Sequence, residues 1–225
     1  MKIKIMIKSM RISLIVASAA LLGAIFLGFG GSALAQEPVP EIGKSLIHPA
    51  HPLYFLKKVR EILELKFAPN SGIQAIRYLE FSQRRIREIR SLVESGRADL
   101  IPSTLEHYLF NLQKATALTD FKNEAKAKQL AEIVSIHLQV MTDIYSSIDH
   151  EAAKRSLRTA IFKLSEWRSL LRERLTTKLQ DDLSDYLAKF QGKICDFLIK
   201  EASSSALNEV EIAVLLERVK KCRGL

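Results

Sequence analysis

Residues 151–191 read EAAKRSLRTAIFKLSEWRSLLRERLTTKLQDDLSDYLAKFQ, and this stretch decides the fold class. Its apolar residues recur at steps of three and four, the spacing that places side chains on one face of an α-helix. These residues are Ala153, Leu157, Ala160, Leu164, Trp167, Leu171, Leu175, Leu179 and Leu183. A helix with so long an apolar face needs another helix to cover it. We therefore predict one long helix from Glu151 to about Gln191, capped by Asp149 and weakened or ended by Gly192.

The same spacing occurs earlier in the chain. A short helix is predicted to start near Leu53 and to end before Pro69, because the residue before a proline avoids helical geometry. Its apolar positions are Leu53, Leu56, Val59, Ile62 and Leu63. A second helix is predicted from about Ser71 to Ser95, where Gly96 supplies the stop.

Polar capping residues predict the remaining helix starts. Ser103-Thr104-Leu105-Glu106 has the spacing of a capping box, while Asn123 and Asn208 are typical of N-caps. We find no segment with the alternating pattern of a β-strand. The predicted fold class is all-α, as an antiparallel helical bundle or a stack of helical hairpins.

The first 35 residues have the pattern of a secretory signal peptide. Lys2, Lys4, Lys8 and Arg11 precede an uncharged apolar run, and Ala33-Leu34-Ala35 forms a small-residue cleavage site. An uncleaved anchor through residues 12–35 stays open, because the uncharged stretch exceeds the roughly 20 residues that cross a bilayer. With either outcome, we expect the rest of the chain to be extracytoplasmic, secreted or in the cell envelope.

Four segments follow from this organisation: the leader (1–35), a proline-rich tether (36–52), a helical domain (53–190) and a C-terminal helical hairpin (191–225) packed on it. Without the leader the chain keeps 30 of its 34 Lys and Arg and all 25 Asp and Glu, a net charge of +5. So diffuse an excess does not indicate a nucleic-acid partner, although it favours anionic lipid heads or envelope polymers. We expect membrane contact only if the leader is uncleaved.

The only two cysteines, Cys195 and Cys222, leave two interpretations open. An exported chain favours a disulfide, worth on the order of 3 kcal/mol for a loop of this length. However, a turn at Ser203-Ser204-Ser205 would place the two residues at different heights on antiparallel helices, more than about 10 Å apart.

Arginines are concentrated in the second predicted helix. Arg77, Arg84, Arg85 and Arg87 could contact an anion or a partner, but they are spread around the helix and acidic residues lie at i,i+4 positions. A solvated, ion-paired surface is the simpler interpretation.

Two motifs resemble an exported bacterial family called domain of unknown function 5667. Pro52-Leu53-Tyr54, Leu56 and Lys57 fit a P-L-Y-x-L-K start, and Ser82 to Glu88 resembles the family's A-x-x-R-L-x-E helix, with Arg85 and Glu88 as its charged positions. The likeness covers roughly His51 to Trp167. It implies a signal peptide or anchor, a helical extracytoplasmic domain and no established activity. We interpret the motif as structural, with Tyr54 and Leu56 locking the first helix onto the bundle while Lys57 and Lys58 stay in water.

Catalytic motifs are missing from the sequence. No mature histidine follows a glutamate by three residues as a di-iron bundle needs, and there is no H-E-x-x-H, G-x-S-x-G or phosphate-binding glycine loop. His137 is expected to be a core residue. We therefore expect no enzyme, metal or cofactor.

Two function classes remain. The first is a non-enzymatic, exported helical protein of the cell envelope that acts through an unknown protein, an envelope polymer or another copy of itself. The alternative is a periplasmic chaperone or stress-sensor type of helical protein. Such proteins carry an L-T-x-x-Q motif, and the stretch from Leu175 to Gln180 resembles it only faintly.

Overall fold

A computed structural model describes residues 42–203 and 207–223, without the side chains of 185–191, 193 and 221–223. This part of the chain contains seven α-helices and one short 3-10 helix, and no strand. The α-helices are α2 (Tyr54–Lys66), α3 (Ser71–Glu94), α4 (Ile101–Leu118), α5 (Glu124–Ser146), α6 (Glu151–Arg174), α7 (Thr177–Ala202) and α8 (Glu209–Arg223), and the 3-10 helix η1 spans Ala98–Leu100. The predicted leader, residues 1–35, lies outside the described residues.

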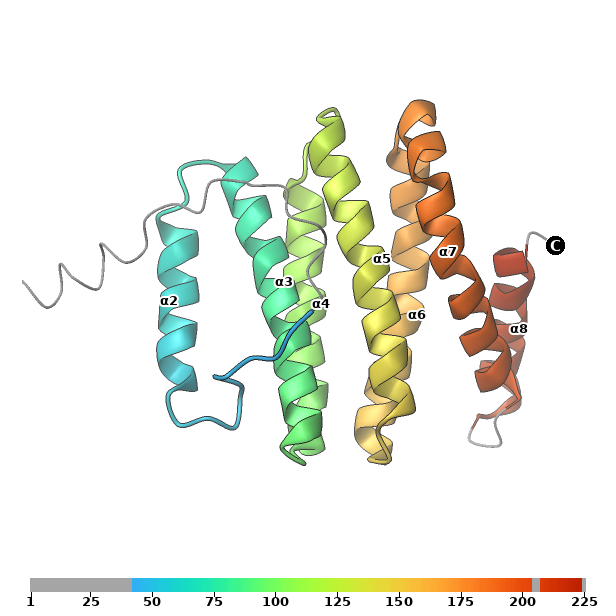
Figure 1. Cartoon of the computed structure of the whole chain (residues 1–225), viewed down its shortest axis with the longest axis horizontal. Helices are drawn as coiled ribbons and strands as arrows, with labels where there is room; N and C mark the ends of the chain where they lie inside the picture. The colour runs from blue at the N-terminus through green and yellow to red at the C-terminus, as the bar shows by residue number, and fades with distance from the viewer. Residues whose placement is uncertain (1–41, 204–206, 224–225) are drawn as a thin grey trace, which may run out of the picture. The chain divides into compact units, whose positions relative to one another are not determined.

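The helices form stacked antiparallel hairpins, which confirms the all-α prediction. Helix α3 packs along α4, α5 along α6, and α7 along α8, and successive hairpins meet through α3 with α5, α4 with α6, and α5 with α7 (Figure 1). The core between them contains apolar residues from every hairpin, among them Ile86, Leu112, Leu138, Leu157 and Leu198. Helix α2 stands at the edge of this stack, against α3.

Several helix ends lie where the sequence predicted them. Gly96 follows α3 with a φ of 69°, a left-handed conformation that glycine adopts without strain. Asn123 accepts a bond from the backbone N–H of Lys126 at the start of α5. Asn208 and Glu211 form a reciprocal capping box at the start of α8.

Two predicted caps were wrong. Helix α4 begins at Ile101, ahead of the expected capping box, because η1 leads directly into it and Pro102 fits the first turn. The hydroxyls of Ser103 and Thr104 donate to the carbonyl of Leu100 instead of accepting a backbone N–H. At α6 the cap is His150, whose Nδ1 accepts from the N–H of Ala153, and not Asp149.

The single long helix predicted from Glu151 was also wrong. The helix ends at Arg174, and Leu175 and Thr176 form the turn that separates α6 from α7. The Thr176 hydroxyl caps α7 by accepting a hydrogen bond from the N–H of Leu179. Leu175, Leu179 and Leu183 stay buried beyond the break, in a second cluster with Ala127 and Ala131 of α5. Apolar spacing continues across the hairpin, so spacing alone did not reveal the turn.

Gly192 does not end a helix. It lies inside α7, and a β-carbon added there would meet no atom within 4 Å. The boundary expected at residue 190 therefore falls within one continuous helix, and the C-terminal hairpin consists of the whole of α7 with α8.

The proline-rich tether lies on α3 from Ile42 onward. Ile42 is buried, and its carbonyl accepts a bond from Arg90. Ser45 bonds in both directions with Ser91. This docking places the chain beside α3 before α2 begins. Among the described residues, no helix is long and apolar enough to cross a membrane.

Candidate functional site

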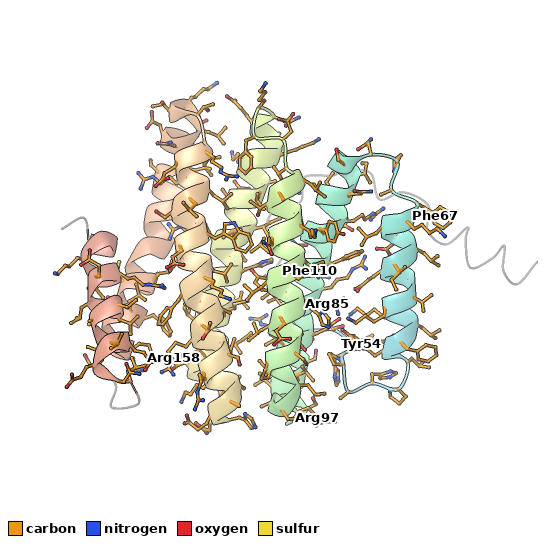
Figure 2. The ribbon with its side chains drawn as sticks, turned by 180° about the vertical axis from the view of Figure 1, so that it is seen from behind. Tyr54, Phe67, Arg85, Arg97, Phe110 and Arg158 are labelled. Carbon is orange, nitrogen blue, oxygen red and sulfur yellow. The ribbon has the colours of Figure 1, made fainter. Side chains whose placement is uncertain are left out.

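Charged side chains join α2 to α3. We define the Arg85 cluster as Tyr54, Lys57 and Glu61 of α2 with Arg85 and Glu88 of α3. Arg85 and Glu88 are 1% and 0% exposed, and Glu61 is the only buried residue of α2. Tyr54 and Arg85 lie together between the two helices (Figure 2). Ion pairs and hydrogen bonds between buried side chains thus link α2 to α3.

Arg85 lies at the centre of this cluster. Its Nη1 donates to both oxygens of Glu88, at 2.8 and 2.6 Å, and to the Tyr54 hydroxyl, while its Nη2 donates to Glu61. The Tyr54 hydroxyl in turn donates to Glu88 Oε2 at 3.0 Å. A buried guanidinium needs such partners, because an unpaired charge in the interior is strongly unfavourable.

Lys57 completes the charge balance. Its Nζ lies 2.6 Å from Glu88 Oε1 and also donates to the Ser45 hydroxyl and the Ile47 carbonyl, each at 3.0 Å. Two cations therefore face two carboxylates. Lys57 also ties the docked tether to α2, so the tether, α2 and α3 share one polar junction.

Burial changes the acid–base behaviour of this cluster. Desolvation raises the pKa of Tyr54, and the neighbouring Glu88 adds to the rise, so its phenol stays protonated. Burial also raises the pKa of Glu61, which Arg85 opposes and Glu88 reinforces. For Arg85, burial acts downward, but the carboxylates of Glu88 and Glu61 outweigh it and raise the pKa. The guanidinium is permanently charged and the cluster is suited to holding two helices together.

Most apolar residues of α2 point the other way. Seven large side chains on or beside this helix form what we call the outer face of α2. They are Leu53 (47% exposed), Phe55 (59%), Leu56 (51%), Val59 (49%), Ile62 (63%), Leu63 (41%) and Phe67 (72%). Phe67 projects away from the other helices in Figure 2. Of the described residues, no other helix exposes so many.

This arrangement corrects the orientation expected from the sequence. Leu56 was predicted to pack on the bundle and Lys57 to stay in water, yet Leu56 is half exposed and the Lys57 side chain is only 15% exposed. Tyr54 does lock the helix, as predicted. Glu61 lies four residues after Lys57 and seven after Tyr54, so helical spacing places all three on one face. That shared polar face was the available sequence signal for an inward-facing charged surface.

The four arginines predicted as anion or partner contacts do not form one surface. Arg77 pairs with Glu80 and Arg84 with Glu64, while Arg85 is enclosed in its cluster. Arg87 is half-buried and lies close enough to His137 to disfavour its protonation. Arg84 therefore strengthens the attachment of α2 to α3, because Glu64 belongs to α2.

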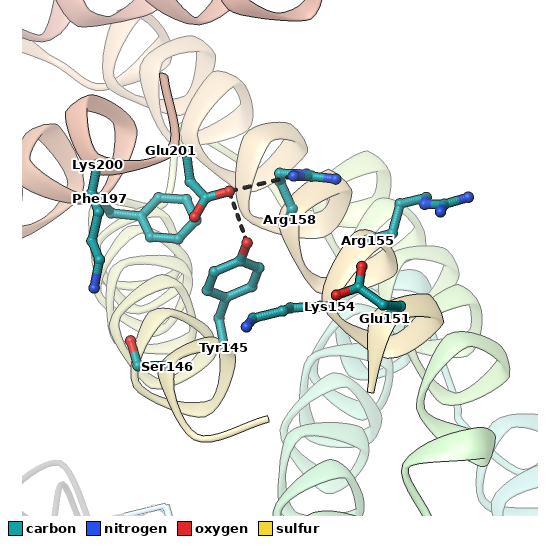
Figure 3. Close-up of a pocket in the computed structure, with 9 residues that line it drawn as sticks. All are labelled: Tyr145, Ser146, Glu151, Lys154, Arg155, Arg158, Phe197, Lys200 and Glu201. Atoms are coloured by element: carbon teal, nitrogen blue, oxygen red, sulfur yellow. Dashed lines mark hydrogen bonds and ion pairs between the residues drawn. The ribbon is translucent and has the colours of Figure 1, made fainter. Parts of the chain in front are cut away.

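A second polar site lies between α5, α6 and α7, and no sequence pattern predicted it. It is a cavity of about 220 Å³. The lining residues are Tyr145, Ser146, Glu151, Lys154, Arg155, Arg158, Phe197, Lys200 and Glu201 (Figure 3). The Tyr145 hydroxyl donates to Glu201 Oε2 at 2.7 Å, and Arg158 lies 3.5 Å from the same oxygen. The buried carboxylate is thus already neutralised, and no spacing within one helix could have predicted residues drawn from three.

His137 is a core residue, as predicted. It is fully buried in α5, and its Nδ1 lies 3.1 Å from the Tyr108 hydroxyl of α4. Burial lowers its pKa to about 3, and Arg87 contributes, so the imidazole is neutral at physiological pH. Among residues 42–203 and 207–223, no three His, Cys, Asp or Glu side chains gather as a metal group.

Cys195 is disulfide-bonded. The chain has one other cysteine, Cys222, whose side chain lies outside the described residues.

Comparison with known proteins agrees with the motif likeness. The family described as Domain of unknown function (DUF5667) matches residues 46–220. This match extends beyond the stretch from His51 to Trp167 on which the resemblance was first based. It includes α2 to α7 and most of α8. No curated protein and no solved structure matches the chain.

Proposed function

This chain belongs to the DUF5667 family, and we propose that it is an exported, non-enzymatic helical protein of the cell envelope that binds a partner through the outer face of α2. The outer face carries this proposal. Monomeric proteins rarely expose a contiguous apolar patch larger than a few hundred Å². The seven large apolar side chains of the outer face are each roughly half exposed. Together they expose an apolar area on the order of 700 Å², which is larger than such a patch.

The energetics favour a covered surface. Burying one such side chain completely is worth about 1.5–3 kcal/mol, so covering the exposed half of each is worth about 1 kcal/mol. The Arg85 cluster prevents α2 from turning this face inward, because rotation would take Lys57 and Tyr54 away from the buried Glu88 and Glu61 away from the buried Arg85. The outer face is therefore buried by binding a partner and not by packing against the rest of the chain.

The non-enzymatic part of the proposal follows from how the polar groups are used. In both polar sites the most buried acids are occupied: Glu88 by Arg85, Lys57 and Tyr54, and Glu201 by Tyr145 and Arg158. Pairing of this kind explains why these acids are buried without requiring a catalytic role, and it supports the non-enzymatic proposal.

Site-specific photocross-linking in the native envelope tests the proposed function. A photoreactive residue is placed at Ile62 in the full-length chain and, as the matched control, at Leu170 of α6, which is 55% exposed outside the outer face. Position 62 should give a defined adduct and position 170 should give little. Equal labelling from both positions, or none from position 62, would overturn the proposal.

One observation also supports the chaperone alternative: the exposed apolar outer face of α2 could bind unfolded client proteins. The Leu175–Gln180 stretch does not support it. Leu175 and Leu179 are buried, Thr176 caps α7, and the Gln180 side chain donates to the carbonyls of Arg172 and Leu175. Suppression of client aggregation that Ile62→Ser abolishes would favour this alternative.

A further inference from the structure

We propose that the occupant of the outer face of α2 is an anionic lipid surface, on which α2 lies with its axis in the headgroup region. This inference rests on the proposed function, because it identifies the partner of the same face. Two observations support it: the distribution of charge on α2 and the position of α2 along the chain.

The charge of α2 is sorted between its two sides. Both of its acids, Glu61 and Glu64, are used on the α3 side, where they pair with Arg85 and Arg84. Lys66 is exposed at the end of the helix, beside Phe67. The side that faces outward thus combines large apolar residues with the positive charge of Lys66 and no unpaired acid.

This combination is typical of helices that lie in a membrane interface. Their apolar side chains enter the boundary between headgroups and acyl chains, while Lys and Arg reach the lipid phosphates. Phe55 and Phe67 sit near opposite ends of α2, so an aromatic ring is available at each end. A second copy fits less well, because its outer face would add a second Lys66 and no acid to pair with either lysine.

Chain length would keep α2 close to a membrane that held the leader. The uncharged stretch that begins at Ile12 ends at Gln36, and α2 begins at Tyr54. The residues between them span at most about 60 Å when fully extended. Helix α2 is also the first helix described after that stretch. A leader inserted in the bilayer would therefore hold the outer face at a high effective concentration near lipid.

Vesicle co-sedimentation tests this inference. The chain from Gln36 onward removes the leader's own affinity for lipid and retains the compact unit Ile42–Leu225. Vesicles containing phosphatidylglycerol are compared with vesicles of phosphatidylcholine alone. We expect binding to the anionic vesicles that weakens with added salt, and weaker binding to the neutral ones.

Three variants locate the contact. Phe55→Ser and Ile62→Ser should each reduce binding to anionic vesicles by about tenfold, because each removes a side chain that would enter the lipid. Leu170→Ser, equally exposed but on α6, should bind as the unchanged chain does. Circular dichroism checks that each variant is folded, which the exposure of all three side chains favours.

The outcomes separate the lipid inference from the proposed function. No binding to anionic vesicles, or equal loss in all three variants, overturns the lipid inference. If the protein does not bind anionic vesicles but position 62 still cross-links to a protein or polymer, the proposed function stands and the lipid inference does not. A concentration-dependent dimer that Ile62→Ser abolishes identifies a second copy and also overturns the lipid inference.

Discussion

Lys57 Nζ lies 2.6 Å from Glu88 Oε1, and this ion pair fixes which side of α2 meets the protein. Successive residues of an α-helix point about 100° apart. Turning Lys57 toward α3 therefore turns Leu56, its neighbour, toward solvent. The junction also contains Arg85, so the orientation depends on several charges that are buried together.

Removing Lys57 should weaken the attachment of α2. Lys57→Met leaves Glu88, which is fully buried, without one of its two cations. We expect a loss of about 1–3 kcal/mol in the free energy of unfolding, measured by urea denaturation. Lys66→Met is the control, because Lys66 is exposed on the same helix, and it should change stability by less than about 0.5 kcal/mol. Equal effects from the two variants would contradict the assigned role of Lys57.

Removing Arg85 should release α2 before the rest of the fold. Arg85→Met leaves both Glu61 and Glu88 without their main partner, at a cost of about 3–5 kcal/mol. Hydrogen exchange should quicken along Tyr54–Lys66 more than along α5 and α6. Arg77→Met removes only an exposed pair with Glu80, worth about 0–1 kcal/mol, and should leave exchange in α2 unchanged. Uniform acceleration in every helix would show that α2 is not a separate unit.

The buried His137 should make the protein sensitive to acid. Its pKa falls from 6.5 to about 3 on folding, so the unfolded chain binds a proton that the folded chain excludes. Stability contributed by this group is complete above about pH 6.5 and is lost as the pH falls toward 3, by up to about 1.4 kcal/mol per pH unit. His137→Gln should flatten this dependence in urea titrations between pH 6.5 and 4. Tyr108→Phe removes the hydroxyl beside His137 but keeps the buried imidazole, and should retain the wild-type slope.

Two glycines should respond oppositely to alanine. Gly192→Ala lies inside α7 with open space around the new β-carbon, so we expect a gain of about 0.5–1 kcal/mol. Gly96→Ala also meets no neighbour, but its φ of 69° is left-handed and should cost about 1–2 kcal/mol. Thermal denaturation compares the two. A loss of stability in Gly192→Ala would mean that α7 is not continuous there.

Much of the fold could be predicted because apolar periodicity reports which residues face a core. Leu157, Leu164 and Leu171 lie on the apolar face predicted for residues 151–191 and are buried. Gly96, Asn123 and Asn208 mark helix ends through their own backbone or side-chain chemistry. The turn at Thr176 was missed because the apolar residues keep the spacing of one helix across the α6–α7 hairpin. In the sequence, nothing distinguishes a threonine that caps a helix from one that does not.

The sequence by itself determined the helical class, most helix starts, the family likeness and the residues that could carry charge. Only the tertiary structure decided which side of α2 faces inward. Leu56 and Lys57 each lie on a helical face that could pack, and local periodicity favours burying the apolar one. The buried Arg85 and Glu88 of α3 reverse that preference. Without Lys57 and Glu61 they would lose part of their charge pairing in the interior, which costs more than exposed leucines. This reversal depends on a contact between residues far apart in the chain, which no local pattern contains.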